Sequence, residues 1–168
     1  TEATVESTVD RVNSDLLDIR QIFDAANYNI VQEFDISSEK FAEQFSLLYE
    51  VNSDKIESLA LYGNEGRLIA SEPVAVEKEN IDVKGQDWYK NAESAIENVH
   101  FSIPHIQNLY EDGLYRYHWV VSLSRYVDIN DGEIPGSGVL LVDMKYSVIE
   151  DVLKQINDSS EGIYYYMI

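Results

Sequence analysis

Apolar residues in the first thirty positions recur at alternating intervals of four and three. They are Val5, Val9, Val12, Leu16, Ile19, Phe23, Ala26 and Ile30, and the positions between them are mostly polar. A repeat of 3.5 residues over three heptads is typical of a coiled-coil seam, so residues 1–34 are predicted to form one long helix. Leu17 and Ile22 widen the stripe, which leaves two alternatives open: packing of this helix on its own domain, or self-association into a homodimer.

A second helix and a β-hairpin follow. Side chains in the break at Asp35–Ser38 can cap free amides, and the apolar face of the next helix consists of Phe41, Phe45 and Leu48. Residues 56–61 form a predicted strand, residues 63–66 a turn of sequence Gly-Asn-Glu-Gly, and residues 67–70 the returning strand. In these segments the pattern changes from a helical period to the period of two that is typical of strands. The sequence therefore predicts that a sheet begins directly after the helices.

The second half of the chain is predicted to be mainly strand. A helix begins at Asp87 as its N-cap and runs to Val99. Predicted strands then cover 100–107, which Pro104 breaks or places at an edge, 115–127 and 138–144, with a loop over 128–136. A helix over 146–156 and a strand over 162–168 complete the chain.

Consecutive strands joined by short turns pair in antiparallel fashion, and here the helices are segregated from them. The expected class is α+β, with a long N-terminal helix and a central antiparallel sheet flanked by helices. Residues 35–156 form the expected globular module. Residues 157–168 supply a terminal strand that closes this module or opens a second one.

The charge narrows the range of partners. A net charge of −19 over 168 residues repels nucleic-acid phosphates and anionic lipid headgroups. It favours cationic or zwitterionic ligands or loosely held divalent ions, although a solvated acidic surface has the same composition. No cysteine is present, which excludes disulfides and thiolate chemistry. No apolar run reaches the ~18 residues of a membrane span. Because the chain begins at Thr1, a fragment is expected whose membrane anchor lies outside these residues.

Motifs for catalysis, metals and nucleotides are missing from the sequence. There are three histidines and no G-x-S-x-G elbow. The segment Asp128–Glu133 resembles the start of an EF-hand loop, but its glycine is at the fifth position and Val139 replaces the bidentate Glu. Nothing resembles a phosphate-binding loop. The chain is therefore expected to be no enzyme and to hold neither metal nor cofactor.

A small-ligand pocket is the remaining candidate site. Aromatic residues accompany a few titratable groups in segments suited to burial, which is the usual composition of such a pocket. The candidates are Trp88, Tyr89, Tyr110, Arg116, His118 and Asp143. Plain core packing is the alternative for each aromatic residue. Asp143 differs, because an unpaired carboxylate inside the apolar run 138–144 is costly and needs Arg116, a backbone amide or a ligand amine as its partner.

Three motifs in order resemble the Cache (PAS-like) domains of bacterial sensors. The helix start Asp87–Ala92 is similar to their D-W-Y-x-x-A, the strand Gly138–Asp143 to their G-V-x-x-V-D, and the hairpin Leu61–Ala70 to the turn that opens their sheet. Residues 1–156 share the resemblance, which is strongest to YesM-like sensor histidine kinases, themselves double-Cache proteins.

The resemblance implies an extracytoplasmic, ligand-sensing domain held between two membrane helices of a histidine kinase in a two-component system. Amino-acid-binding relatives hold the ligand carboxylate with an Arg two residues before the Trp, and here that residue is Gln86. An amine, a sugar or another polar metabolite is then expected, unless Arg116 or Lys84 substitutes and an amino acid binds. The alternatives are the ectodomain of a chemoreceptor or cyclase, or a ligand-free structural dimerisation module.

Overall fold

The computed structural model describes residues 1–96, 98–114, 116–132 and 134–159. Its helices are α1 (Glu2–Asp24), the π-helix η1 (Ala25–Val31), α2 (Glu39–Val51), α3 (Asp87–Ser94) and α4 (Tyr146–Ser159). Its strands are β1 (Ile56–Gly63), β2 (Leu68–Glu72), β3 (His100–Phe101), β4 (His105–Ile106), β5 (Trp119–Asp131) and β6 (Ile134–Lys145).

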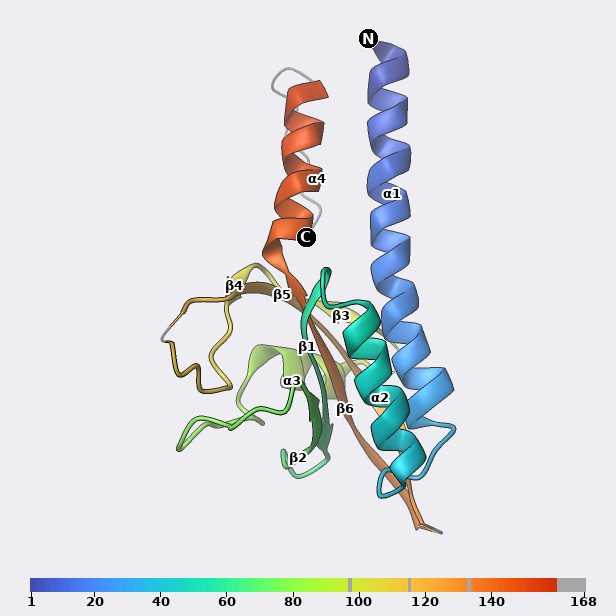
Figure 1. Cartoon of the computed structure of the whole chain (residues 1–168), viewed down its shortest axis with the longest axis vertical. Helices are drawn as coiled ribbons and strands as arrows, with labels where there is room; N and C mark the ends of the chain where they lie inside the picture. Colours follow the sequence, from blue (N-terminus) through green and yellow to red (C-terminus); the bar gives the residue numbers. More distant parts are fainter. Residues whose placement is uncertain (97, 115, 133, 160–168) are drawn as a thin grey trace.

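All strands belong to one antiparallel sheet in the order β2-β1-β6-β5-β3, and β4 also pairs with β5. The long β5–β6 hairpin forms the centre of the sheet, and β1 lies against β6 (Figure 1). The predicted α+β class with a central antiparallel sheet flanked by helices is confirmed.

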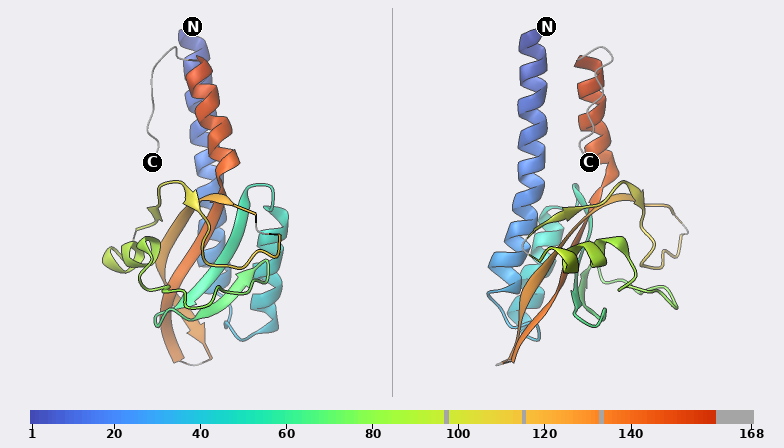
Figure 2. Two further views of the ribbon diagram at one scale, coloured as in Figure 1. Left: turned by 90° about the vertical axis from the view of Figure 1, so that its left-hand side faces the viewer. Right: turned by 180° about the vertical axis from the view of Figure 1, so that it is seen from behind.

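Helices cover the two faces of the sheet unequally. The lower part of α1, with η1 and α2, covers one face, and α3 with its flanking loops lies over the other (Figures 1 and 2). The larger apolar core lies between the sheet and the first group of helices, where Phe23, Phe41 and Phe45 are almost fully buried. A smaller core around Tyr62, Trp88 and Tyr89 lies under α3.

The predicted N-terminal helix is confirmed, and its lower half packs on its own domain. Ile19, Phe23, Ala26 and Ile30 are buried against the sheet, and the segment Ala25–Val31 continues the helix with wider π turns. The upper half of α1 extends away from the sheet, and α4 lies beside it (Figures 1 and 2). The side chains of the upper seam positions, Val5, Val9, Val12 and Leu16, lie outside the described part of the structure, so self-association through them stays a prediction.

The helix predicted from Asp87 to Val99 is shorter and is capped differently. Gln86 is the N-cap residue, and the helix ends at Ser94. A ring nitrogen of His100 lies 3.2 Å from the Ala95 carbonyl oxygen and satisfies one of the open carbonyls of the last turn. The chain can therefore leave the helix early and enter β3, which pairs with β5.

Two strand predictions need correction. The expected strand 100–107 is divided into β3 and β4, because Pro104 has no amide hydrogen for the ladder. The expected loop 128–136 is mostly strand, because the chain reverses tightly at Gly132, whose φ of 66° suits glycine. Conversely, β5 begins at Trp119 and not at residue 115.

The other helices and strands predicted within the described residues lie where the structure has them. Ser38 is the N-cap of α2 and accepts from the Phe41 amide, and the hairpin of β1 and β2 turns at residues 63–66. The predicted strand 162–168 lies outside the described residues. Among the helices that the structure describes, none has the length and apolar character of a membrane span.

Candidate ligand-binding site

Three polar side chains form a row across the middle of the sheet. Asp143 of β6 pairs in register with Ser58 of β1 on one side and Ser122 of β5 on the other. Directly paired residues share a face of the sheet, so all three side chains point to the α3 side. They are 6% exposed at most, which makes this polar row part of the interior.

Hydroxyl groups are the hydrogen-bond partners of the Asp143 carboxylate. Ser122 Oγ donates to Oδ1 at 2.5 Å, and Ser58 Oγ donates to Oδ2 at 3.5 Å. Burial raises the pKa of Asp143 to about 6, although the Ser122 hydrogen bond and the nearby His105 act in the opposite direction. The predicted need for a partner is thus met by two serines and not by Arg116, which contacts Asp112.

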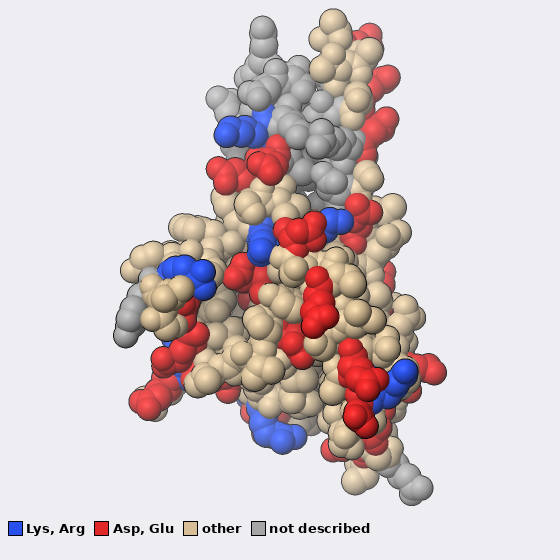
Figure 3. Space-filling view, in the orientation of Figure 1, with Lys and Arg blue, Asp and Glu red and all other residues tan. Residues whose placement is uncertain are grey.

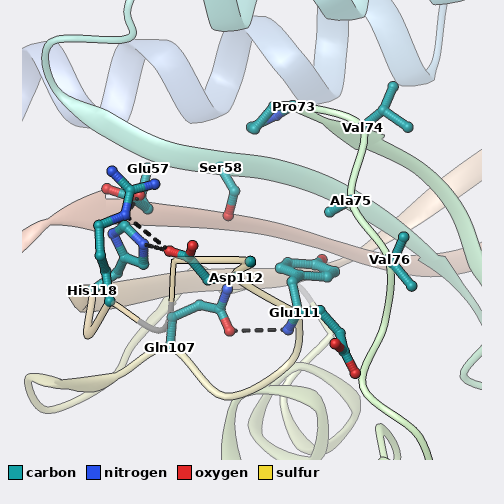
Figure 4. A pocket seen from close by; sticks show the side chains of 13 residues that line it. Glu57, Ser58, Pro73, Val74, Ala75, Val76, Gln107, Glu111, Asp112 and His118 are labelled. Carbon is teal, nitrogen blue, oxygen red and sulfur yellow. Dashed lines mark hydrogen bonds and ion pairs between the residues drawn. The ribbon is translucent and has the colours of Figure 1, made fainter.

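A cleft of about 540 Å³ opens above the Ser58 end of this row (Figure 4). Glu57 and Ser58 of β1 form its floor, residues 73–76 form one wall, and residues of the 107–118 segment form the other. Its size falls within the range usual for small-molecule sites. Asp143 itself lies one side chain deeper, behind Ser58.

Backbone hydrogen bonds fix the two walls of the cleft to each other. The Lys78 amide donates to the Leu109 carbonyl at 2.9 Å, and the Glu111 amide donates to the Val76 carbonyl at 2.8 Å. The side chain of Gln107 accepts from the amides of Leu109 and Tyr110, which holds the turn at the start of the second wall. The cleft is therefore preformed rather than a gap between independent loops.

His118 connects one wall of the cleft to its floor. Its Nδ1 lies 2.9 Å from a Glu57 carboxylate oxygen, and its Nε2 lies 2.6 Å from Asp112 Oδ2. The Arg116 guanidinium also contacts Asp112, at 3.2 Å. The hydrogen bond from His118, followed by one from the Leu114 amide, lowers the pKa of Asp112 to about 2. This carboxylate is therefore an ion-pair partner at neutral pH.

Tyr110 lies between the cleft and the smaller core. Its hydroxyl is 2.7 Å from that of Tyr62, and both rings are buried, which raises the pKa of each phenol. Its backbone pairs with Glu77, whose Oε1 is buried without a partner in the described part of the chain. Polar groups thus continue from the cleft into the interior.

The predicted site residues are divided between two places. Tyr110, Arg116 and His118 line the cleft, and Asp143 lies beneath it.

The predicted residues on α3 do not line the cleft. The Trp88 ring packs against Tyr62 in a tilted arrangement with ring centres 5.3 Å apart, and the Tyr89 hydroxyl donates to the Gly63 carbonyl. The Gln86 side chain contacts the Asp82 carbonyl. A contact of these residues with ligand stays a prediction.

Sequence reasoning missed several lining residues. Glu57 and Ser58 interrupt the apolar run of β1. This interruption could have identified them from the sequence, because polar residues on a central strand require hydrogen-bond partners. Gln107, Glu111 and Asp112 lie in an irregular segment whose path no periodicity could give. Within the ranges that the structure describes, no group of three or more His, Cys, Asp or Glu could hold a metal ion.

The face of the molecule that carries the helix layer is acidic, in keeping with the composition. Acidic side chains lie along α1 and over the helix layer on the face shown in Figure 3, with fewer basic ones among them. Such a field lowers the local concentration of anions and raises that of cations.

Comparison by sequence finds no matching family model and no matching curated protein. Comparison by structure finds ligand-binding domains of bacterial chemoreceptors. The PctB domain of Pseudomonas aeruginosa PAO1, in complex with L-Gln, has a TM-score of 0.61 at 18% identity over 96% of this chain. The CtaA domain of Pseudomonas fluorescens, in complex with L-alanine, has a TM-score of 0.67 at 18% identity over 90% of this chain.

A third similar structure is the PctC domain of Pseudomonas aeruginosa PAO1 in complex with GABA, with a TM-score of 0.63 at 19% identity over 92% of this chain. The match covers 59%, 61% and 64% of the PctB, CtaA and PctC chains, so this chain spans less than two thirds of their length.

Proposed function

We propose that this chain, which has the fold of Cache (PAS-like) sensor domains, is an extracytoplasmic module that binds a small polar molecule in the cleft between residues 73–76 and 107–118. The observation that carries the proposal is the preformed cleft above the buried row of Ser58, Asp143 and Ser122. A protein keeps polar groups in a sheet interior at a cost in stability, which a binding function explains.

The cleft suits a ligand with both polar and apolar parts. One wall consists of Pro73, Val74, Ala75 and Val76, and the opposite wall carries charged groups. Arg116 is exposed at the rim and is available for a ligand carboxylate, which Gln86 is not. Amino acids therefore join amines and sugars as candidate ligands, and the amino-acid complexes of the structurally similar domains support their inclusion.

The parent protein is proposed to be an integral membrane receptor with this domain outside the cell membrane. The sequence resemblance favours a histidine protein kinase as its output. The structural neighbours favour a chemoreceptor, because their domains belong to chemoreceptors. The sequence that follows α4 in the full-length gene separates the two, since a kinase core and a chemoreceptor signalling domain share no motif.

Homodimerisation through α1 is part of the proposal. The backbone of the upper half of α1 extends away from the sheet, and this half carries the first positions of the heptad pattern in the sequence. Sedimentation equilibrium of the fragment checks this, and a strictly monomeric fragment at millimolar concentration contradicts it.

Isothermal titration with a panel of amino acids, amines and sugars tests ligand binding. We expect at least one compound to bind, and Arg116→Ala to weaken a carboxylate-bearing ligand by about 10-fold or more, because an ion pair in the cleft is lost. The matched control is Arg20→Ala, since Arg20 makes a similar ion pair with Asp24 at 3.3 Å on α1 and does not line the cleft. Equal affinity of both variants would refute the assigned role of Arg116, and a panel without any binding would refute the proposed function.

A further inference from the structure

Asp143 is a carboxylate without a cation in contact. It is 1% exposed, and within the described residues it forms no ion pair with Lys, Arg or His. Its oxygens accept from two serine hydroxyls, as described above. A buried negative charge held only by hydroxyl groups is costly, and binding a proton removes this cost.

Ser122 connects this carboxylate to a histidine. Ser122 Oγ lies 3.3 Å from His105 Nε2, and the other ring nitrogen, Nδ1, lies 3.0 Å from the Ile103 carbonyl and 3.2 Å from Ser102 Oγ. His105 is half-buried at the edge of the sheet and therefore reaches water. The serine is thus a bridge between an interior acid and a partly exposed base.

The cluster can take up one proton while Asp143, Ser122 and His105 stay hydrogen-bonded to one another, and the partner of His105 Nδ1 changes from Ser102 to the Ile103 carbonyl. With Asp143 ionised, Ser122 donates to it, His105 Nε2–H donates to Ser122, and Nδ1 accepts from Ser102. With Asp143 protonated, Asp143 donates to Ser122, Ser122 donates to Nε2, and Nδ1–H donates to the Ile103 carbonyl. The second arrangement holds one proton more than the first, and that proton is on the Asp143 carboxyl group. The geometry fits either one.

We propose that Asp143, Ser122 and His105 form a proton-binding site whose occupancy is transmitted through β6 to α4. Asp143 is followed by Met144 and Lys145, and α4 begins at Tyr146 with no loop between strand and helix. A change in how β6 packs on β5 therefore changes the base of α4. The signalling step rests on the proposed sensory function, whereas the proton site itself does not.

The charged and titratable groups around Asp143 support uptake at mildly acid pH. Glu57 of β1 opposes ionisation, and the phenols of Tyr62 and Tyr110 face it from β1 and from the cleft wall. His105 of β4 has the opposite effect and favours the ionised form of Asp143. Burial dominates and raises the pKa of Asp143 to about 6. A packed state that binds the proton more tightly than an opened one is favoured as the pH falls.

The test is a pH titration of the whole fragment by NMR between pH 4 and 8, which follows the side-chain carboxyl ¹³C signal of Asp143. The expected midpoint is near 6. Ser122→Ala and His105→Gln should both raise it, because each removes an interaction that favours the ionised form. His100→Gln on β3 is the matched control, since His100 contacts the Ala95 carbonyl and not the cluster, and it should leave the midpoint unchanged. A midpoint near 4 would overturn the proposal.

Hydrogen exchange of α4 and β6 amides, corrected for intrinsic rates, tests the transmission. As the pH rises, exchange should increase by up to about 100-fold, with the same midpoint as the titration of Asp143. The factor follows from the pKa, since raising it from 3.8 to about 6 makes proton binding tighter by a factor of that size. Asp143→Asn should abolish this dependence. Titration of Asp143 with unchanged exchange in α4 would overturn the transmission. Proton uptake without any bound compound in the calorimetric panel would refute ligand binding and leave the proton site standing.

Discussion

The two faces of the sheet are built from the same three central strands, yet they have opposite characters. On the face covered by α1, η1 and α2, the fully buried residues of β1, β5 and β6 are apolar, and the partly buried Arg125 of β5 contacts Tyr28 of η1. On the face under α3, Ser58, Ser122, Ser124 and Asp143 take alternate positions of the same strands. Strand alternation allows one face to specialise in stability while the other holds polar groups.

The first prediction breaks the apolar face and has the largest effect. Phe45→Ala should reduce the free energy of unfolding by about 3–5 kcal/mol, because it leaves a cavity where the ring stacks on Phe41 with centres 5.2 Å apart. Chemical denaturation measures this. Leu47→Ala is the control on the same helix; Leu47 is 49% exposed, so a change of less than about 0.5 kcal/mol is expected. Similar losses in both variants would contradict the assigned core.

The second prediction concerns pH and the polar face. The folded-state pKa of Asp143 lies above its unfolded value, so its stabilising contribution is complete below about pH 4 and is lost as the pH rises through about 6. Relative to Asp143→Asn, the wild-type protein should lose up to about 3 kcal/mol of unfolding free energy between pH 4 and pH 8. Denaturation curves at a series of pH values measure the difference. Parallel pH profiles of the two proteins would be inconsistent with a raised pKa.

The third prediction compares hydroxyl groups on the two sides. Tyr110→Phe leaves the buried Tyr62 hydroxyl without its partner and should cost about 1–2 kcal/mol. Tyr28→Phe on the helix side removes a hydroxyl that accepts from Arg125 but is half-exposed, so its effect should stay below about 0.5 kcal/mol. Thermal denaturation of both variants gives the comparison. A larger effect at Tyr28 would reverse this ranking.

Much of the fold could be predicted because its signals are local. The apolar stripe of α1, the Ser38 cap and the Gly63–Gly66 turn each act within a few residues. The limits of α3 and β5 could not be predicted in this way. A histidine six residues beyond Ser94 caps the end of α3, and a single glycine at 132 lets the β5–β6 hairpin turn tightly.

The candidate site was predicted less completely than the fold. Asp143 was identified because a carboxylate in an apolar run needs a partner, but which partner depends on the register of three strands. Trp88 and Tyr89 were singled out by composition, whereas the structure gives them contacts in the smaller core. Glu57 and Asp112 are joined by His118, which contacts both carboxylates, and no spacing in the sequence encodes these contacts.

The π-helix η1 affects how α1 presents itself to any partner. Its hydrogen bonds reach five residues along the chain instead of four, as in the bond from the Gln32 amide to the Asn27 carbonyl. Each residue of such a segment rotates the chain by less than an α-helical residue does. The backbone of α1 before Ala25 is therefore rotated about the helix axis relative to that of an unbroken α-helix. Ala25–Val31 thus determines how far α1 is rotated about its own axis relative to the sheet. A one-residue deletion there would rotate the whole upper part of the helix.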